Sequence, residues 1–535
     1  MLGSRAPLSI SLLRIGRCVA TKRYKANKVL MQSQTSILLN RANLSSLPND
    51  IRRPAYDVEN VQTGIVHIGV GGFHRAHEAM YVDRLMAKTG DLSWGICGVG
   101  LRENDRAMKK VFDEQDNLYT LVEKHNDGSR SASVIGAMTG FLMAPDDPQA
   151  VIDKMAEPEV RIVSLTITEG GYNFDASSGE FITTNPDVIH DIGNPKTPKL
   201  VFGYLVAALK KRKENNVRPF TVMSCDNIQH NGHVLKKMLL AYIELFDQAF
   251  ATWVDENVSF PNSMVDRITP ATTNEDIATL RAQGVEDAWP VVCEPFDQWV
   301  IEDDFCNTKP CLDLVGAQFV SDVAPYEKLK LRMLNAGHSV LGLVGSVAGL
   351  ETIHESVEAK QLKRLLSIFM EQEVMPTLDP VEGIDVYEYR DTLLSRFSNP
   401  FIKDTLARIC LESSAKLPVF LFPTVRDNLA ANRDTDISAL VVACWAFYSD
   451  RHASQDGKSL EINDVLADKL HNAASNNQID SLSFLMLEEV FGKLVDEARF
   501  TASFQGFVER LYQQEPVLLI SEKVANNKLE LARAC

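Results

Sequence analysis

The stretch Ile65-Val66-His67-Ile68-Gly69-Val70-Gly71-Gly72-Phe73-His74 (65–74) decides the fold. It is a short apolar run that ends in glycine and continues into an amphipathic segment through Leu85. Glycines at this place let the backbone approach a pyrophosphate, which the free N–H groups and the dipole of the following helix stabilise. His74 occupies the place of the third glycine in the usual G-x-G-x-x-G spacing. A plain tight turn between a strand and a helix stays the alternative interpretation.

Further apolar runs alternate with helical segments up to about residue 323. The predicted strands are Trp94–Val99, Val160–Thr168, Phe220–Ser224 and Ser263–Ile268, and the predicted helices include Lys199–Lys213 and Gly232–Asp255. Buried strands separated by helices predict a parallel sheet with right-handed crossovers. Shorter β-like segments between Leu118 and Leu142 indicate antiparallel additions.

Beyond about Ala324 the strand signal nearly vanishes. The helical candidates there are Pro325–Val347, Val357–Glu373, Ile402–Glu412, Ile437–Tyr448, Leu482–Phe491 and Phe500–Gln513. We therefore predict an α/β Rossmann-type dinucleotide-binding domain with extra β elements over residues 39–323. A predominantly α-helical domain for substrate and catalysis is predicted over residues 324–535.

The composition excludes several classes of partner. The 535 residues carry a formal net charge of −16, and such a surface repels phosphate backbones and anionic lipid. For this reason we expect no nucleic-acid partner. We also expect no transmembrane segment, because even the most apolar stretch, Leu334–Ile353, is interrupted by polar residues and glycines. The nine scattered cysteines are typical of reduced thiols rather than of a disulfide framework. Cys306 and Cys311 are the only pair whose spacing leaves a metal site open.

The N-terminal 49 residues contain no Asp or Glu and eight Lys or Arg. An Arg-rich, acid-free segment is typical of a mitochondrial transit peptide, so residues 1–38 are predicted to be a basic extension that could direct the chain to the matrix. The alternatives are an extension without a targeting role, or translation that begins at Met31. Without a functional signal, we expect a cytoplasmic protein.

The second predicted strand ends in a segment that bears on the choice of cofactor. An acidic residue there can bind a ribose diol and repel a 2′-phosphate, so Glu103 and Asp105 favour NAD over NADP, although Arg102 weakens the argument. A helix cap or a solvated turn is the alternative for both acids. The residues predicted to contact NAD are Ile68, Gly69, Gly71, Gly72, Phe73, His74, Glu103 and Asp105.

Polar side chains open the first helix of the second half. On an ideal helix Lys330, His338 and Asn335 lie at about 0°, 80° and 140°, so all three point to one side of the helix. A solvated face does not explain Asn335 and His338, because the helix becomes apolar immediately afterwards. Side chains that only cap or bridge helices remain an alternative.

A second polar cluster, Ser224–Gly232, follows a predicted strand. Because strand C-termini face the ligand crevice in α/β sheets, Asn227 is placed to meet a substrate, and Glu169 has the same placement after another strand. Asp226, His230 and His233 are interpreted as caps of the next helix rather than as metal ligands.

Five strings carry a resemblance to a known family. GVGGFHRAH (69–77), SCDNIQHNG (224–232), FPNSMVDRITP (260–270), EPFDQWVIED (294–303) and KLRMLNAGHS (330–339) closely resemble the long-chain polyol dehydrogenases of the mannitol dehydrogenase family, most of all the mannitol 2-dehydrogenases. The similarity runs from about Leu39 to near the C-terminus. This family also has histidine at the third glycine position.

The resemblance implies an NAD-dependent, metal-independent oxidation of D-mannitol to D-fructose, which is reversible. Lys330 would be the general base, made competent by burial and neighbouring positive charge. Asn227 and Asn335 would donate hydrogen bonds to the developing alkoxide. His338 would orient the sugar hydroxyls, and Glu169 would lie on the proton route to solvent. Asp266 and Arg408 would line the polyol site, with structural ion pairing as the alternative for both.

Three other interpretations remain open. Tyr326 and Lys330 have the spacing of the short-chain dehydrogenase pair, but we interpret Tyr326 as a packing residue. A fructuronate or tagaturonate reductase is the alternative within the class, and a non-catalytic NAD-binding sensor is the alternative outside it. The expected partner is a polyol or ketose, and the expected assembly is a monomer or a small homo-oligomer.

Overall fold

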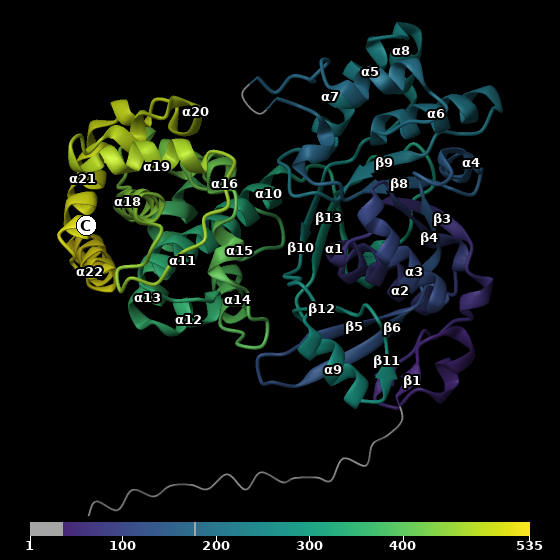
Figure 1. Cartoon of the computed structure of the whole chain (residues 1–535), viewed down its shortest axis with the longest axis horizontal. Helices are drawn as coiled ribbons and strands as arrows, with labels where there is room; N and C mark the ends of the chain where they lie inside the picture. Colours follow the sequence, from purple (N-terminus) through teal and green to yellow (C-terminus); the bar gives the residue numbers. More distant parts are fainter. Residues whose placement is uncertain (1–35, 176–177, 535) are drawn as a thin grey trace, which may run out of the picture.

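A five-stranded parallel sheet forms the centre of the first half of the chain (Figure 1). The computed structural model describes residues 36–175 and 178–534. The strand order is β7 (Met138–Met143), β4 (Gly95–Gly100), β3 (Thr63–Ile68), β8 (Ile162–Leu165) and β9 (Thr221–Ser224). From β3 the chain first forms one edge of the sheet through β4 and β7. It then forms the other edge through β8 and β9. The switch point of the sheet therefore lies between β3 and β8, where ligands bind at the carboxyl ends of such strands.

Helices cover both faces of this sheet, which is why its strands are apolar on both sides. Val66 and Ile68 point toward one face and Ile65 toward the other. The first face packs on α4 (Pro148–Ala156), α6 (Val201–Glu214), α7 (Asn231–Glu244) and α8 (Gln248–Asn257), and the second packs on α2 (Glu78–Thr89) and α3 (Arg106–Glu114). The single helix predicted over Gly232–Asp255 is wrong, because the Asp247 side chain caps a new helix by accepting the Phe250 N–H.

Smaller sheets extend the α/β half. β12 (Val291–Cys293), β5 (Tyr119–Lys124), β6 (Arg130–Ile135) and β2 (Ile51–Arg52) form one, and β10 (Ser263–Asp266), β13 (Gln298–Glu302) and β14 (Gln318–Val320) form another. The antiparallel β5–β6 hairpin confirms the predicted additions between Leu118 and Leu142, whereas β7 joins the main parallel sheet instead. The predicted strand at Ser263–Ile268 exists as β10, but it pairs antiparallel with β13 outside the main sheet.

The second half of the chain is helical (Figure 1). Its helices are α10 (Ala324–Lys330), α11 (Ala336–Val347), α12 (Ile353–Glu358), α13 (Lys360–Ile368), α14 (Val386–Phe397), α15 (Leu406–Cys410), α16 (Ser413–Phe420), α17 (Phe422–Ala430), α18 (Asp436–Arg451), α19 (Ala467–Ser475), α20 (Glu488–Phe491), α21 (Ala498–Tyr512) and α22 (Val517–Ala534). Helix α11, the most apolar stretch of the sequence, is buried along its whole length and packs on α18. Residues 324–335 lie at the seam between the two halves.

Several helix predictions in this half were too long or missing. The predicted Ile402–Glu412 helix is only α15, because Lys403 has a φ of 52° and the Thr405 side chain caps the helix start. The predicted helix over Pro325–Val347 contains a π-helical turn at Leu331–Asn335 between α10 and α11, and a second π-helical turn, Phe369–Val374, follows α13. Helices α14, α16, α17, α19 and α22 were not predicted, and α12 was missed except for its last two residues.

The N-terminal predictions are tested only at their edge. The transit-peptide interpretation of residues 1–38 lies almost entirely outside the described residues. Ile37 and Leu38 form strand β1, which pairs in parallel with β11 (Val285–Glu286), so these two residues belong to the folded body. The domain boundary at 323/324 remains a prediction, and α10 begins at Ala324.

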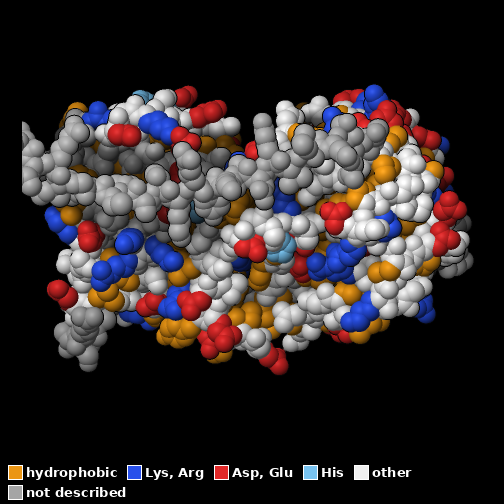
Figure 2. Space-filling model, turned by 90° about the horizontal axis from the view of Figure 1, so that it is seen from below, with side chains coloured by type: hydrophobic (Ala, Val, Ile, Leu, Met, Phe, Trp, Pro, Cys, Tyr) orange, Lys and Arg blue, Asp and Glu red, His pale blue; other side chains and the backbone are white. Residues whose placement is uncertain are grey.

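The surface and the cysteines bear on the remaining expectations. Figure 2 shows acidic and basic side chains interspersed on the face that it presents. Within residues 36–175 and 178–534, no helix is long and apolar enough to cross a membrane. The described cysteines, Cys97, Cys225, Cys293, Cys306, Cys311, Cys410 and Cys444, are free thiols.

Candidate active site

A cavity of about 350 Å³ lies at the seam between the α/β half and the helical half. Its lining includes seven of the side chains singled out in the sequence: Glu169, Asn227, Asp266, Lys330, Asn335, His338 and Arg408. Phe73 of the glycine loop and Lys416 of α16 line it as well. The structure therefore brings the predicted catalytic and substrate-binding residues together in one place.

Lys330 is the last residue of α10 and is 5% exposed. Its Nζ donates a hydrogen bond to Asn227 Oδ1. Burial lowers the pKa of Lys330 below the ordinary lysine value, and the Arg396 charge acts in the same direction against the opposing effect of Asp266 and Glu327. This amine can therefore lose its proton more readily than a solvated lysine can.

Asn335 and His338 follow Lys330 through the π-helical turn Leu331–Asn335. Such turns interrupt α-helices mainly at functional sites, and here the turn changes the angular spacing predicted for an ideal helix. The His338 ring is buried against Phe397, with ring centroids 4.6 Å apart. Burial lowers the pKa of His338 to about 4, so the ring is neutral at pH 7. Its buried Nε2 has no partner among the described residues, which leaves it available to a ligand hydroxyl.

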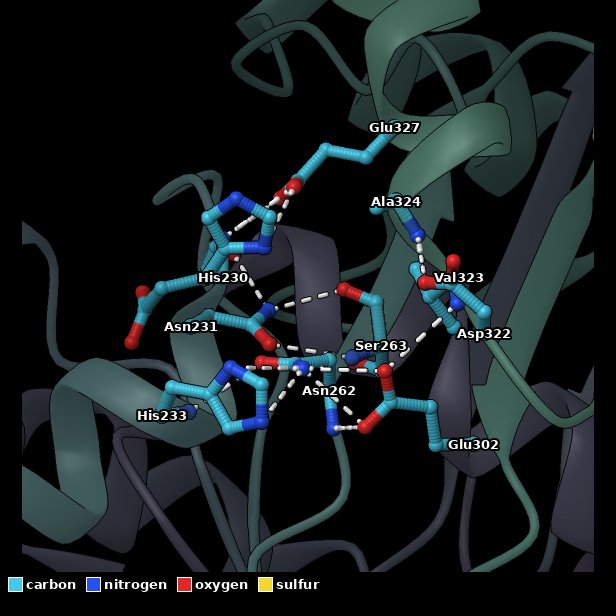
Figure 3. Close-up of polar contacts among 11 residues, drawn as sticks. His230, Asn231, His233, Asn262, Ser263, Glu302, Asp322, Val323, Ala324 and Glu327 are labelled. Atoms are coloured by element: carbon cyan, nitrogen blue, oxygen red, sulfur yellow. Dashed lines mark hydrogen bonds and ion pairs between the residues drawn. The ribbon is translucent and has the colours of Figure 1, made fainter.

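The loop that carries Asn227 is held at both of its ends (Figure 3). Asn231 donates to Asp226 O at 3.0 Å and to Ser263 O at 2.8 Å, which ties the loop to β10. The Glu327 carboxylate accepts the His230 N–H at 3.1 Å, from a position one turn before Lys330. Burial raises the pKa of Glu327 to about 7. A buried carboxyl group that titrates near neutral pH therefore lies beside Lys330.

Glu169 follows a strained residue at the end of β8. Thr168 is β-branched and has a φ of 60°, a conformation that such residues rarely adopt. The buried Asp226 carboxylate fixes it by accepting the N–H groups of Ile167 at 3.0 Å and Thr168 at 2.9 Å. Glu169 itself is exposed and lines the cavity from its rim. Its predicted place on a proton route stays a prediction.

Asp266 and Arg408 have different surroundings, although both line the cavity. Asp266 is buried and forms a bidentate ion pair with Arg396 at 2.8 and 2.9 Å. Burial alone would raise the pKa of Asp266, but the Arg396 guanidinium reverses this effect and holds it below the ordinary value. The Arg408 side chain is 48% exposed and pairs with Asp404, with Nε 2.6 Å from Oδ1. Both ion pairs and the cavity lining are present, so the two interpretations made from the sequence are compatible.

A second cavity, of about 200 Å³, lies at the switch point of the parallel sheet. Its lining is Ile68, Gly69, Val70, Gly71, Leu101, Arg102, Asp105, Thr166, Ile167 and Thr168. Gly69 has a φ of +98°, and a Cβ built there would lie 2.2 Å from Thr166 O. Only glycine satisfies both conditions, so the backbone of the β3 loop is shaped to approach a ligand closely, as a dinucleotide site requires.

The other predicted cofactor residues are placed as follows. Gly72 begins helix α1 (Gly72–Ala76), and Phe73 faces the larger cavity. The His74 ring is buried beneath the loop. Glu103 does not line the smaller cavity; it is exposed and pairs with Arg106 at the start of α3, which is the solvated-turn alternative. Asp105 does line the cavity, and its carboxylate accepts the Arg102 N–H at 2.9 Å.

Within the described chain, one group of side chains has metal-ligand spacing: His67, His74 and Glu78. Glu78 Oε2 lies 2.9 Å from His67 Nδ1 and 3.0 Å from His74 Nδ1, and it accepts a hydrogen bond from Ser164 Oγ. The His67 and His74 rings are stacked at 3.5 Å. These contacts already join the donor atoms to one another beneath the glycine loop, so the group is accounted for as a hydrogen-bonded support of that loop.

Comparison with known families agrees with this arrangement. The family model of the mannitol dehydrogenase Rossmann domain matches residues 63–314, and that of the mannitol dehydrogenase C-terminal domain matches residues 322–512. The chain belongs to the mannitol dehydrogenase family. Mannitol dehydrogenase DSF1 of Saccharomyces cerevisiae is 41% identical over 492 residues, which are 91% of this chain and 98% of that protein. A mannitol 2-dehydrogenase of Pyricularia oryzae is 43% identical over 448 residues, 83% of this chain and 89% of its own.

Solved structures of the mannitol dehydrogenase family have the same architecture. The mannitol 2-dehydrogenase of Pseudomonas fluorescens, solved as a ternary complex with NAD and D-mannitol, superimposes with a TM-score of 0.84 at 43% identity. The match covers 92% of this chain and all of that one. A D-sorbitol dehydrogenase in substrate-free form gives a TM-score of 0.83 at 37% identity, over 90% of this chain and 99% of that one. The predicted fold class is therefore confirmed.

Sequence reasoning missed three charged residues of this mannitol dehydrogenase site. Glu327 and Arg396 are buried beside Lys330 and Asp266, and Lys416 lines the cavity. Glu327 was visible as an acid three residues before Lys330, so helical spacing could have found it. Arg396 had no comparable signal, because it lies 130 residues from Asp266 in the chain. The hydroxyl of Tyr326 donates to Glu382 O at 3.0 Å, as suits a packing residue.

Proposed function

We propose that this chain catalyses the reversible, NAD-dependent oxidation of D-mannitol to D-fructose, with Lys330 as the general base. The observation that carries the proposal is the position of Lys330: its buried amine is bonded to Asn227 and lines a polar cavity together with Asp266 and with Phe73 of the glycine loop. Relatives named mannitol 2-dehydrogenase, and the one solved with NAD and D-mannitol, support the same substrate and cofactor.

Each polar residue of the cavity is proposed to have a separate role in the reaction. Lys330 in its neutral form removes the proton of the C2 hydroxyl. Because Lys330 donates to Asn227 Oδ1, the amide NH₂ of Asn227 is left as a donor for the oxygen that gains charge, and Asn335 is the second donor. The neutral His338 ring offers its Nε2 to another hydroxyl. Asp266, held ionised, is an acceptor for a substrate hydroxyl.

The smaller cavity is proposed to hold NAD through the backbone of the Gly69–Gly71 turn and the side chain of Asp105. NAD, when bound, accepts the hydride that leaves C2 of the substrate. An acidic side chain after the second strand binds the ribose diol and repels a 2′-phosphate, so Asp105, which lines the cavity, favours NAD over NADP. Glu103 does not line this cavity. A metal is not required in this scheme, because the amine and the two amides already supply the base and the oxyanion donors.

The test is a spectrophotometric assay of NADH formation with purified protein and a panel of mannitol, sorbitol, arabinitol and mannonate. The highest kcat/KM is expected with mannitol, at an unchanged rate in the presence of EDTA, and fructose with NADH should give the reverse reaction. A preference for mannonate would favour the sugar-acid reductase, and Arg408 and Lys416 are cations of the cavity lining that suit its carboxylate. Binding of NADH without turnover of any polyol would favour the sensor.

The compartment and the assembly of the protein are proposed from the sequence. We expect a cytoplasmic monomer or small homo-oligomer, or a matrix protein if the acid-free segment 1–38 is removed as a targeting signal. N-terminal sequencing of the native protein and its mass in solution distinguish these outcomes.

A further inference from the structure

Arg396 joins the helical half of the chain to two carboxylates of the α/β half. It projects from α14 and contacts Asp266 on β10 at 2.8 and 2.9 Å. It also contacts Glu294, which follows β12, at 2.8 and 3.0 Å. All three side chains are buried, with 7%, 4% and 2% exposure for Arg396, Asp266 and Glu294. Buried charges are tolerated only when paired in this way, so removing the arginine leaves two carboxylates without compensation.

The two ends of this network face different spaces. Asp266 lines the substrate cavity, whereas Arg396 and Glu294 line another cavity, of about 480 Å³. The Arg396 guanidinium lies 4.0 Å from the ring centre of Phe296, which also lines that second cavity. The arginine therefore contacts the substrate-lining carboxylate from behind and is not among the residues that line the substrate cavity itself.

The same network reaches the helix of the glycine loop. Glu294 accepts the Ile268 N–H at 2.6 Å, and its backbone carbonyl accepts the Arg267 guanidinium at 3.0 and 2.9 Å. Arg267 Nη1 donates in turn to Ala76 O, at the end of α1, over 2.7 Å. The Glu294 carboxylate is thus fixed on the α/β side by a contact that is independent of Arg396, and Arg396 connects it to the Asp266 carboxylate.

We propose that Arg396 is a positioning residue that keeps Asp266 ionised and oriented as the acceptor for a substrate hydroxyl, and that in a variant without this side chain the cavity behind it admits guanidinium ion to the same place. This inference rests on the proposed function. Four charge-assisted hydrogen bonds fix the Arg396 guanidinium between the two carboxylates. Two of them hold Asp266, which lines the substrate cavity. Without Arg396, repulsion from Glu294 and burial favour a protonated Asp266, which is a poorer acceptor.

The test compares Arg396→Ala with Arg390→Ala. Arg390 lies on the same helix and is also ion-paired, with Glu371 and Asp391, but it does not line either cavity. In Arg396→Ala, the charge-assisted hydrogen bond between a substrate hydroxyl and the Asp266 carboxylate is weakened or lost. The KM for mannitol is therefore expected to rise by about 10- to 100-fold. The dissociation constant for NADH should stay unchanged, and Arg390→Ala should leave both constants as in the wild type.

Chemical rescue separates positioning from a general structural role. Added guanidinium ion should lower the KM of Arg396→Ala toward the wild-type value in a saturable manner, whereas urea, which has a similar shape and no charge, should not. If Arg396→Ala does not fold, Arg396→Lys takes its place, because it keeps the charge and loses the fork; its KM for mannitol should rise by about 3- to 10-fold.

Five results would overturn the inference: an unchanged KM in Arg396→Ala, equal weakening of NADH and mannitol binding, no rescue by guanidinium, rescue by urea as strong as by guanidinium, or an unchanged KM in Arg396→Lys. A wild-type enzyme that oxidises no polyol is a different result. It would overturn the proposed function, and the inference would fall with it.

Discussion

The Gly69→Ala substitution tests whether the β3 loop is shaped by its contact with the β8 loop. The new Cβ would lie 2.2 Å from Thr166 O, where real contacts are at least 3.0 Å, so one of the loops must move by about 0.8 Å. Both loops line the smaller cavity. If the displaced loop loses one charge-assisted hydrogen bond to the dinucleotide, binding weakens by about 1.5–3 kcal/mol, so the dissociation constant for NADH is expected to rise about 10- to 100-fold.

The positive φ of Gly69 adds a second penalty, which Gly90→Ala isolates as a control. Gly90 caps the C-terminus of α2 with a φ of +73°, and a Cβ there meets nothing within 4 Å. The positive φ destabilises both variants by about 1 kcal/mol or more, but only Gly69→Ala also has the steric clash. The assay is titration of NADH fluorescence, with thermal unfolding measured in parallel. If Gly69→Ala binds NADH like the wild type and unfolds no earlier than Gly90→Ala, the reasoning is refuted.

Three further predictions concern the larger cavity. Lys330→Met, which keeps the buried volume, should lower kcat for mannitol by about 10²- to 10⁴-fold at unchanged NADH affinity, as steady-state kinetics and titration would show; a kcat within tenfold of the wild type would exclude Lys330 as the base. In the pH profile of kcat, activity should rise as Lys330 loses its proton, and Asp266→Asn should move this rise to lower pH, because the Asp266 charge raises the pKa of Lys330; a move to higher pH would contradict the assignment. Burial raises the pKa of Glu327 from 4.5 to about 7, so its folded state favours the protonated form and the wild type loses stability as the pH rises from about 4.5 to 7. Relative to the wild type, Glu327→Gln should therefore gain about 3 kcal/mol in unfolding free energy between pH 4 and pH 8 in denaturant titrations, and a pH-independent difference would contradict this.

The sequence supported the parts of this structure that depend on local pattern. The apolar run before Gly69, the polar residues after β8 and β9, and the fan of Lys330, Asn335 and His338 were all read from short stretches, and the structure places them around two adjoining cavities. Their common feature is that a strand end or one helix face brings the side chains to the site.

The remainder depends on contacts between distant segments or on single side chains. Arg396 reaches Asp266 across 130 residues of sequence, and no local pattern marks it. The division between α7 and α8 depends on one cap, Asp247, within an otherwise continuous helical pattern. The π-helical turn at Leu331–Asn335 lies inside a sequence with ordinary helical periodicity, so the predicted angles between Lys330 and His338 followed the wrong number of residues per turn.

That π-helical turn holds one residue more than an α-helical turn would, without rotating the helix that follows it. Deleting one residue among positions 331–334 would restore ordinary α-helical bonding, a change that looks harmless from propensity alone. Four α-helical steps cover about 400°, and five π-helical steps cover about the same angle, so the Asn335 amide and the His338 ring would keep nearly the same direction relative to Lys330. A variant with this deletion is therefore expected to keep both side chains facing the cavity, so any loss of activity in it would report on the wider turn itself.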